Sequence, residues 1–252
     1  MEITPIAYFS SPFTSKFGIP RQSGLLEDVE GEIVFVKPYD NPDAIRGIEG
    51  FTHLWLVWGF SATNTDSQAA SHDTRTTADT PTTATDITAN HAQQHTTHAP
   101  TESLLVRPPR LGGNERIGVF ASRSPFRPNR LGLSSVRLEA IEQGRLRVRG
   151  ADLMDGTPIY DIKPYITFTD SHPDATSGFV DDRQWNELDV RFPEHLQAPF
   201  SAAEIRTIKA ALREDPRPQY HSDSDRVYGM PFSGHDIRFT VSNGTATVVE
   251  VR

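Results

Sequence analysis

The sequence contains no cysteine among its 252 residues, so disulfides, thiolate zinc sites and cysteine nucleophiles are excluded. It has no apolar run long enough to span a bilayer. Its first residues, MEITPIAYF, lack the charged-then-apolar order of a signal peptide. Together these absences predict a soluble, cytoplasmic protein that uses neither thiol chemistry nor a membrane anchor.

The formal net charge is −8, which by itself argues against a nucleic-acid partner, because phosphates are bound chiefly by lysine and arginine. The charge is unevenly distributed. Residues Arg107 to Arg149 contain ten arginines, no lysine and three acidic residues, so one basic block lies in an otherwise acidic chain. Within it, "RLRVRG" (Arg145 to Gly150) alternates as a solvated strand face would. The stretch "RIGVFASRSPFRPNRLGLS" (Arg116 to Ser134) does not alternate, which favours a binding role for its arginines.

Short runs rich in β-branched and aromatic residues, separated by Gly, Pro and Asn, predict strands in the first two thirds of the chain. These runs are Ile6 to Phe9, Glu32 to Val36, His53 to Phe60, Ile117 to Ala121, Ser135 to Ile141 and Arg145 to Arg149. No helical segment of convincing length separates them, which argues against a parallel βαβ sheet with a Rossmann site. We therefore expect a mainly β fold, with an antiparallel β-barrel over residues 1–169.

A different pattern begins after Thr169. Ser201 and Glu204 have the spacing of a helix capping box, and the "DPRP" run at 215–218 ends the helix. Two apolar runs, "DIRFTV" and "TATVVEV", flank Asn243 and Gly244, which is a strong hairpin signal. These patterns predict a smaller α+β domain over residues 170–252.

Residues 61–103 consist mostly of Thr, Ala, Ser and Asp, with Ile87 as their one large aliphatic residue and no aromatic residue. Such a segment cannot bury enough apolar surface to offset its ordering entropy, so it is predicted to be a disordered surface insertion. His91, His95 and His98 within it have a spacing that would share a helical face. The low-complexity surroundings and the lack of a suitably spaced carboxylate favour no metal site.

Four motifs of the first domain, in this order and spacing, resemble the TsaA-like domain of the tRNA adenine-37 methyltransferases, the TrmO family. They are "FGIPRQSGL" (17–25), "RGIEGFTHLWLVWGF" (46–60), "RPPRLGGNERIGVFASRSPFRPNRLGLS" (107–134) and "DLMDGTPIYDIKPY" (152–165). Near the C-terminus, "DPRPQY" and "YGMPFSGHDIRFTV" are similar to the C-terminal domain of the bacterial members. The resemblance covers nearly the whole chain apart from the insertion.

The resemblance implies a β-barrel methyltransferase that uses S-adenosylmethionine as methyl donor and no metal. Its implied substrate is the threonylcarbamoylated adenine at position 37 of tRNA that reads threonine codons, methylated on the exocyclic amine by a homodimer. The positive sulfur of the donor already activates the methyl group, so positioning provides most of the catalysis. No catalytic side chain or general base is assigned.

The resemblance also implies which residues contact the donor: Pro20, Arg21, Gln22, Ser61, Ala62, Arg123, Leu133, Leu153, Met154, Asp155 and Gly156. A guanidinium can bind the donor's carboxylate, Asp155 can accept from a ribose hydroxyl or an amine, and Gly156 lets the backbone approach. Arg21 and Arg123 could instead form salt bridges, and "DGT" could be a tight turn alone. Bacterial members usually have His-Gln at positions 61 and 62, so this chain departs from the family there.

For tRNA, the expected contacts are Arg127, Asn129 and Arg130. The strand Ile117 to Ala121 would deliver Arg123 to the donor, and the proline-fixed turn would hold Arg127 and Arg130 outward. Asn129 could equally be a turn residue.

Two other functions remain open at this point. One is a non-catalytic barrel that binds a nucleotide or RNA, because a fold alone does not determine function. The retained PRQ, SRS and DGTP elements speak against it. The other is methylation of a small metabolite, which the basic block and the C-terminal domain disfavour.

Overall fold

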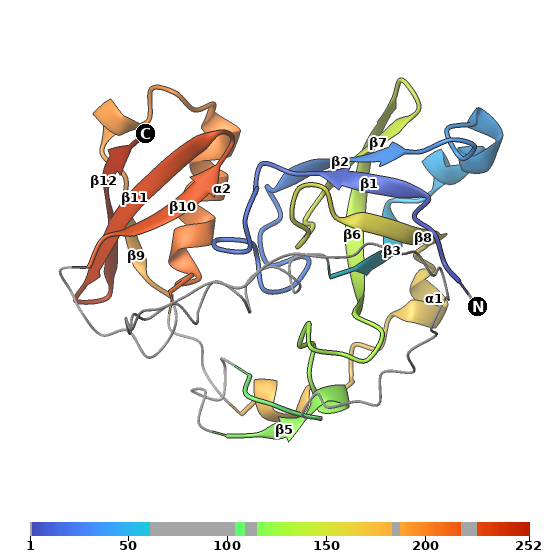
Figure 1. Cartoon of the computed structure of the whole chain (residues 1–252), viewed down its shortest axis with the longest axis horizontal. Coiled ribbons are helices and arrows are strands. Elements are labelled where there is room, and N and C mark those ends of the chain that lie inside the picture. The colour runs from blue at the N-terminus through green and yellow to red at the C-terminus, as the bar shows by residue number, and fades with distance from the viewer. Residues whose placement is uncertain (1, 61–103, 109–114, 183–186, 218–225) are drawn as a thin grey trace, which may run out of the picture.

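The computed structural model describes residues 2–60, 104–108, 115–182, 187–217 and 226–252. The predicted insertion at 61–103, with His91, His95 and His98 and with Ser61 and Ala62, lies outside the described residues. The mainly β prediction is confirmed: the described chain forms a six-stranded, a four-stranded and a two-stranded sheet (Figure 1). Within these ranges, no helix has the length and apolar character needed to cross a membrane.

The six-stranded sheet is built entirely from antiparallel pairs. Its strands hydrogen-bond in the order β1 (Ala7–Ser10), β2 (Glu30–Phe35), β7 (Arg145–Arg149), β6 (Leu131–Glu142), β3 (His53–Gly59) and β8 (Pro158–Pro164). β8 also pairs with β1, so the order closes on itself and every strand has two neighbours. Closure of this kind leaves no unpaired strand edge.

We call this closed six-stranded sheet the ring. Every second side chain along its strands points inward, and these side chains fill its interior. In β3, Leu54, Leu56 and Trp58 are buried, whereas the residues between them are half-buried, because successive side chains point to opposite faces. The buried cluster comprises Ala7, Phe9, Ile33, Leu54, Leu56, Trp58, Val136, Leu146, Val148, Ala151, Leu153 and Ile159. Gly132 allows β6 to approach Trp58, because a Cβ at this position would lie 2.3 Å from the indole. Burial of each large apolar side chain contributes about 1.5–3 kcal/mol to the stability of the fold.

The four-stranded sheet contains β10 (Tyr228–Phe232), β11 (His235–Ser242), β12 (Thr245–Val251) and β9 (Asp189–Arg191), in that order. The predicted helix is α2 (Ala202–Arg213), and its capping box of Ser201 and Glu204 is confirmed. The predicted hairpin joins β11 to β12. Its turn residues Asn243 and Gly244 have φ of 49° and 73°, the left-handed values that such a turn requires.

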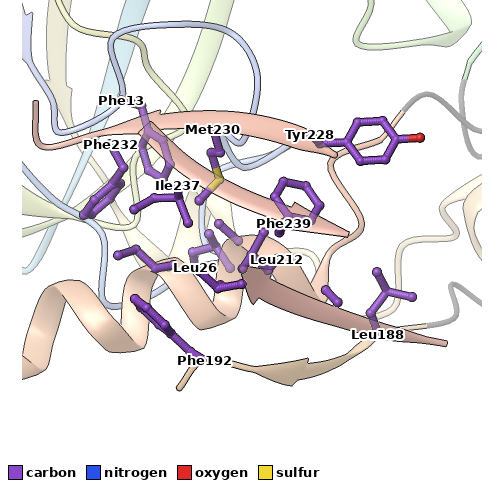
Figure 2. Close-up of a cluster of buried hydrophobic side chains, with 14 of the residues drawn as sticks. Phe13, Leu26, Leu188, Phe192, Leu212, Tyr228, Met230, Phe232, Ile237 and Phe239 are labelled. Carbon is purple, nitrogen blue, oxygen red and sulfur yellow. The ribbon is translucent and has the colours of Figure 1, made fainter. Parts of the chain in front are cut away.

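The segment between β1 and β2, residues 11–29, packs apolar side chains against the four-stranded sheet and forms hydrogen bonds with the ring. Figure 2 shows Phe13 and Leu26 among the side chains of α2, β10 and β11, in the same buried cluster as Met230 and Leu212. Gly18 has φ of 92°, and a Cβ there would lie 2.4 Å from the Met230 sulfur. The N-terminal motif "FGIPRQSGL" is therefore held between the two sheets.

Several element boundaries differ from the sequence-based expectations. The predicted strand 117–121 ends at Gly118, because residues Val119–Ala121 turn into a short 3-10 helix, η4. β6 begins at Leu131, four residues before the predicted start. Strands β4 (Leu105–Val106), β8, β9 and β10 were not predicted, and the remaining short helices are η1 (Pro42–Ile45), η2 (Ile48–Gly50), α1 (Thr167–Asp170), η5 (Gly178–Val180) and η6 (Glu194–Leu196). β4 pairs with β5 (Ile117–Gly118) in the two-stranded sheet.

Candidate functional site

Two loops meet at the end of the ring where β1 ends and β8 begins. One is the 11–29 segment, and the other is the 152–156 turn. The backbone N–H of Ser11 donates to Asp155 Oδ1 at 3.0 Å, and Gly156 N donates to the Phe9 carbonyl at 2.8 Å. The loops that carry "PRQ" and "LMDG" are therefore joined directly.

The 152–156 turn exposes backbone and one carboxylate. Thr157 N and Oγ1 both donate to the Met154 carbonyl, at 3.2 and 2.7 Å, which closes the tight turn. Gly156 has φ of 74°, and a Cβ there would meet open space, so its backbone is uncovered. Leu153 is buried in the ring core and can offer a ligand only its backbone. The structural interpretation of "DGT" as a turn is correct, and it leaves Asp155 and Gly156 accessible.

Arg123 reaches across to the 11–29 segment. Its Nη1 donates to Gln22 Oε1 at 2.9 Å, so the structure brings together two predicted donor residues that are 101 positions apart. Arg21 turns the other way: its Nη2 donates to the Asp215 carbonyl at 3.0 Å, just beyond the end of α2. Pro20, between Ile19 and Arg21, is buried. The "PRQ" motif thus attaches the C-terminal sheet on one side and Arg123 on the other.

Leu133 lies on the outer face of β6, where it is 58% exposed and pairs with Val57 of β3. Two residues further, the Ser135 N–H donates to Ser23 Oγ at 3.3 Å, which ties the 11–29 segment to this strand. The predicted donor contacts at Ser61 and Ala62 lie outside the described residues.

A buried polar chain that the sequence did not reveal lies beneath these loops. Trp58 Nε1 donates to Ser134 Oγ at 2.8 Å, and Ser134 Oγ donates to Asp152 Oδ1 at 2.5 Å. The Asp152 carboxyl also accepts from the backbone of Ser23. Asp152 therefore connects the ring interior, β6 and the 11–29 segment. The sequence feature that could have pointed to Asp152 is its position as the first residue of "DLMDGTPIYDIKPY", at the start of the 152–156 turn.

Burial raises the pKa of the Asp152 carboxyl above its ordinary value of 3.8. The hydrogen bond from Ser134, the backbone bonds and the charge of Arg123 act in the opposite direction without cancelling the effect of burial. The Asp152 carboxyl therefore keeps its proton to a higher pH than an ordinary aspartate does.

Residues 119–130, which we call the arginine loop, fold back on themselves. Arg127 Nη1 donates to the carbonyls of Val119 and Ser122 at 3.2 and 2.6 Å. Its guanidinium also lies 5.8 Å from the centroid of the Phe120 ring. Arg127 therefore does not point outward as expected, because it is half-buried and donates to carbonyls of its own loop. Its contact with tRNA stays a prediction.

Asn129 and Arg130 end the arginine loop. Asn129 is exposed. Arg130 has φ of 49°, a left-handed conformation that is uncommon for a residue other than glycine. Its N–H donates to the Arg127 carbonyl at 3.1 Å, and its own carbonyl accepts from Phe60 N at 2.9 Å. The tRNA contacts of these residues stay predictions.

The arginines of the β6–β7 hairpin differ from those of the arginine loop, because they pair with carboxylates. Arg145 pairs with Glu32 at 3.1 Å and Arg147 with Glu142 at 3.3 Å. Arg137 pairs with Glu139 at 3.0 Å, and Arg149 with Glu30 at 2.6 Å. On the strand face that was predicted to be solvated, glutamates therefore balance the charge of the arginines.

A cavity of about 290 Å³ lies on the outer side of the ring, next to the hairpin. Its lining consists of Gly24, Glu27, Asp28, His53, Ser135, Arg137, Glu139, Arg149 and Gly150, and includes none of the predicted donor residues. Its acidic and basic side chains neutralise one another, so we assign no ligand to it. In the described part of the chain, no group of three or more His, Asp or Glu side chains is placed to hold a metal.

Comparisons with known proteins agree with the motifs. The family model for the tRNA-methyltransferase O N-terminal domain matches residues 8–88 and 86–171, and that for the TrmO C-terminal domain matches residues 186–252. The tRNA (adenine(37)-N6)-methyltransferase of Escherichia coli K12 is 34% identical over 250 residues, covering 94% of this chain and 92% of that relative. The enzyme of the same name from Eikenella corrodens is 45% identical over 151 residues, covering 58% and 85%.

Two proteins from Pseudomonas aeruginosa extend these comparisons. One, from strain PAO1, has a provisional name as an S-adenosylmethionine-dependent methyltransferase, RcsF, and is 34% identical over 94% of this chain and 91% of its own length. The other is a crystal structure of TrmO, which superimposes with a TM-score of 0.70 at 28% identity, covering 100% of this chain and 98% of that one. On the match of both family models and the identity to these relatives, the chain belongs to the TrmO family.

Proposed function

We propose that this chain transfers a methyl group from S-adenosylmethionine to the exocyclic amine of the adenine at position 37 of a tRNA. Relatives named for this activity, at 34% and 45% identity, support the proposal. The structural observation that carries it is the hydrogen bond from Arg123 to Gln22, because it joins two distant motifs beside the 152–156 turn.

The residues around that hydrogen bond fit the donor. S-adenosylmethionine supplies a methyl group that is activated by the positive charge on its sulfur. Arg123 is exposed and can bind a carboxylate, while Asp155 is exposed and can accept from a hydroxyl or an amine. The uncovered backbone of Gly156 allows a ligand to approach closely. The chain's contribution is positioning, which can supply much of the rate enhancement of a transfer from an already activated group.

The finer parts of the proposal concern the substrate and the assembly. We propose threonylcarbamoyl-adenosine in threonine tRNA as the substrate, because the carbamoyl substituent makes the amine N–H more acidic and removes the need for a strong base. We also propose a homodimer in the cytoplasm, with residues 1–169 as a TsaA-like barrel and residues 170–252 as a separate α+β domain. Sedimentation at several concentrations tests the dimer.

The test of the activity is a methylation assay with purified protein, labelled S-adenosylmethionine and tRNA that carries threonylcarbamoyl-adenosine. Nucleoside mass spectrometry should detect one added methyl group on that nucleoside. The control is the same tRNA transcribed without modifications, on which we expect little or no transfer. Absence of transfer to both tRNAs would contradict the proposed function.

The alternative is a non-catalytic RNA-binding module. Such a protein would bind tRNA with the salt dependence of phosphate contacts but would bind neither S-adenosylmethionine nor its product. Calorimetric titration with S-adenosylhomocysteine separates the two functions. Measurable affinity favours the enzyme, and its absence together with retained tRNA binding favours the module.

A further inference from the structure

Two phenylalanines of the arginine loop are turned into solvent. Phe120 is 74% exposed and Phe126 is 61% exposed. Large apolar side chains gathered at the surface of a protein commonly mark an interaction site. Because both phenylalanines lie in one loop, with arginines between and beside them, this loop is a candidate interaction surface.

Hydrogen bonds within the loop hold the two phenylalanine side chains at the protein surface. Ser122 Oγ donates to the Val119 carbonyl at 2.9 Å and accepts from Ser124 N at 3.3 Å. Ser124 Oγ in turn accepts from Phe126 N at 3.2 Å. With the two bonds from Arg127, these contacts hold the backbone on both sides of the rings. A surface that is ordered before binding loses less conformational entropy when its partner arrives.

The chemistry of the loop fits a nucleobase with its phosphate. The Arg127 guanidinium lies over Phe120, at 5.8 Å from the ring centroid. Arg123 and Arg127 donate to neutral oxygens, one of an amide and two of carbonyls, so these hydrogen bonds bring no counter-charge to either guanidinium group. Aromatic rings beside cationic side chains are a common means of binding single-stranded nucleic acid. An apolar protein surface would instead have to desolvate these charges without a counter-charge.

The position of the loop selects which bases it can reach. Arg123 lies between the two phenylalanines in sequence and donates to Gln22 in the predicted donor site. The loop follows β5 and leads into β6, whose Leu133 is a predicted donor residue (Figure 1). A base that stacks on Phe120 or Phe126 would therefore lie near the bound donor.

We propose that Phe120 and Phe126 form a stacking platform for unpaired bases of the tRNA anticodon loop next to the methylated adenine, with Arg127 supporting the Phe120 ring. This inference rests on the proposed function. It adds a specific partner surface, because the platform selects unpaired bases rather than phosphates alone.

The test compares the full-length protein with its Phe120→Ala and Phe126→Ala variants. The matched control is Phe168→Ala, which removes an 88% exposed phenylalanine from α1, outside the arginine loop. One RNA probe is an anticodon stem-loop with 2-aminopurine beside position 37. The other is a fully paired duplex with the same number of phosphates. Binding to both is measured at one salt concentration, together with S-adenosylhomocysteine affinity and sedimentation.

Loss of a stacked base weakens binding by about 5- to 150-fold. We expect each loop variant to lose at least about fivefold in affinity for the stem-loop and less than about twofold for the duplex. The 2-aminopurine emission should be quenched by the parent and less by the variants. Phe126→Trp should restore binding and quenching, because indole also stacks. The Phe168→Ala control should behave as the parent.

Three outcomes would overturn the platform. Equal losses for stem-loop and duplex would mean that the rings only support phosphate contacts. A shift in sedimentation with unchanged RNA binding would mean that a second copy of the chain covers the rings. Unchanged binding and sedimentation would mean that the rings have no partner of either kind. If the parent methylates tRNA in any of these cases, the proposed function stands while the platform fails.

Discussion

The basic block of this chain divides into two regions with the same residue type and different electrostatics. In the β6–β7 hairpin, Arg137, Arg145, Arg147 and Arg149 each pair with a glutamate. In the arginine loop, Arg123 and Arg127 donate to neutral oxygens. The hairpin is therefore locally compensated, whereas the loop keeps a positive field.

The difference shows why a count of arginines is a poor measure of an RNA-binding surface. Adjacent antiparallel strands bring side chains from β2, β6 and β7 into register, so two glutamates of β2 and two of the hairpin itself compensate its arginines. In the described part of the chain, residues 119–130 of the arginine loop form no strand and so are not aligned with such neighbours. We therefore expect its charge to act on RNA and the hairpin's charge to act within the fold.

The largest expected effect comes from removing the guanidinium that holds the arginine loop together. Arg127→Ala deletes two hydrogen bonds from a charged donor, each of the kind that contributes about 1.5–3 kcal/mol. We expect tRNA affinity to fall about 10- to 100-fold, with a smaller loss of S-adenosylhomocysteine affinity because Arg123 lies in the same loop. Binding titrations measure both. Equal affinities for Arg127→Ala and Arg147→Ala would erase the distinction between loop and hairpin.

The next effect concerns Arg123, which lies nearest to the predicted donor residues. Arg123→Ala should lower S-adenosylhomocysteine affinity by about tenfold, equivalent to about 1.4 kcal/mol, and should lower tRNA affinity less. Calorimetry with the product measures the first quantity. Arg145→Ala in the hairpin is the control and should titrate as the parent does. Unchanged product affinity in Arg123→Ala would remove this residue from the donor site.

A pH experiment tests whether burial raises the pKa of Asp152, whose carboxyl interacts with the charge of Arg123. Because the folded-state pKa of Asp152 is raised above 3.8, the unfolded state binds fewer protons than the folded state between the two values. This carboxyl therefore makes the folded state less stable as pH rises through that window. Asp152→Asn lacks this titration, so its melting temperature should increase relative to the parent as pH rises above 3.8. A change of about 1 kcal/mol would move Tm by about 2–4 °C.

Thermal melts of both proteins at a series of pH values provide the measurement. Other titrating groups are common to the two proteins and largely cancel in the difference. A difference that is constant across pH, or that falls as pH rises, would mean that the pKa of Asp152 is not raised in the folded state.

The smallest effect is expected in the hairpin itself. The double variant Arg145→Ala with Arg147→Ala removes two exposed ion pairs, which contribute little to stability. We expect tRNA affinity to stay within about twofold of the parent and its salt dependence to be unchanged. Arg116→Ala, an exposed position just before the arginine loop, should instead reduce the logarithmic salt slope by about one. A reduced slope in the hairpin variant would show that its ion pairs open to RNA.

Local patterns predicted the local structure well. The capping box of α2 and the Asn243–Gly244 hairpin turn were readable because neighbouring residues alone determine them. The strand predicted through Ala121 failed because β-branched and aromatic residues did not reveal the bend stabilised by Arg127 eight positions later. Strand β8 was missed because its prolines and charges obscure alternation.

The sequence by itself determined the mainly β class, the helix and hairpin near the C-terminus, and the motifs that identify the family, since each depends on residue types at short spacing. Only the tertiary structure decided that Gln22 meets Arg123, that Asp152 is buried under both loops, and which arginines are neutralised. Those outcomes depend on strand order and on the packing of the 11–29 segment against the C-terminal sheet. The contacts of Arg123 with Gln22 and of Arg145 with Glu32 join residues more than 100 positions apart, so no local pattern encodes them.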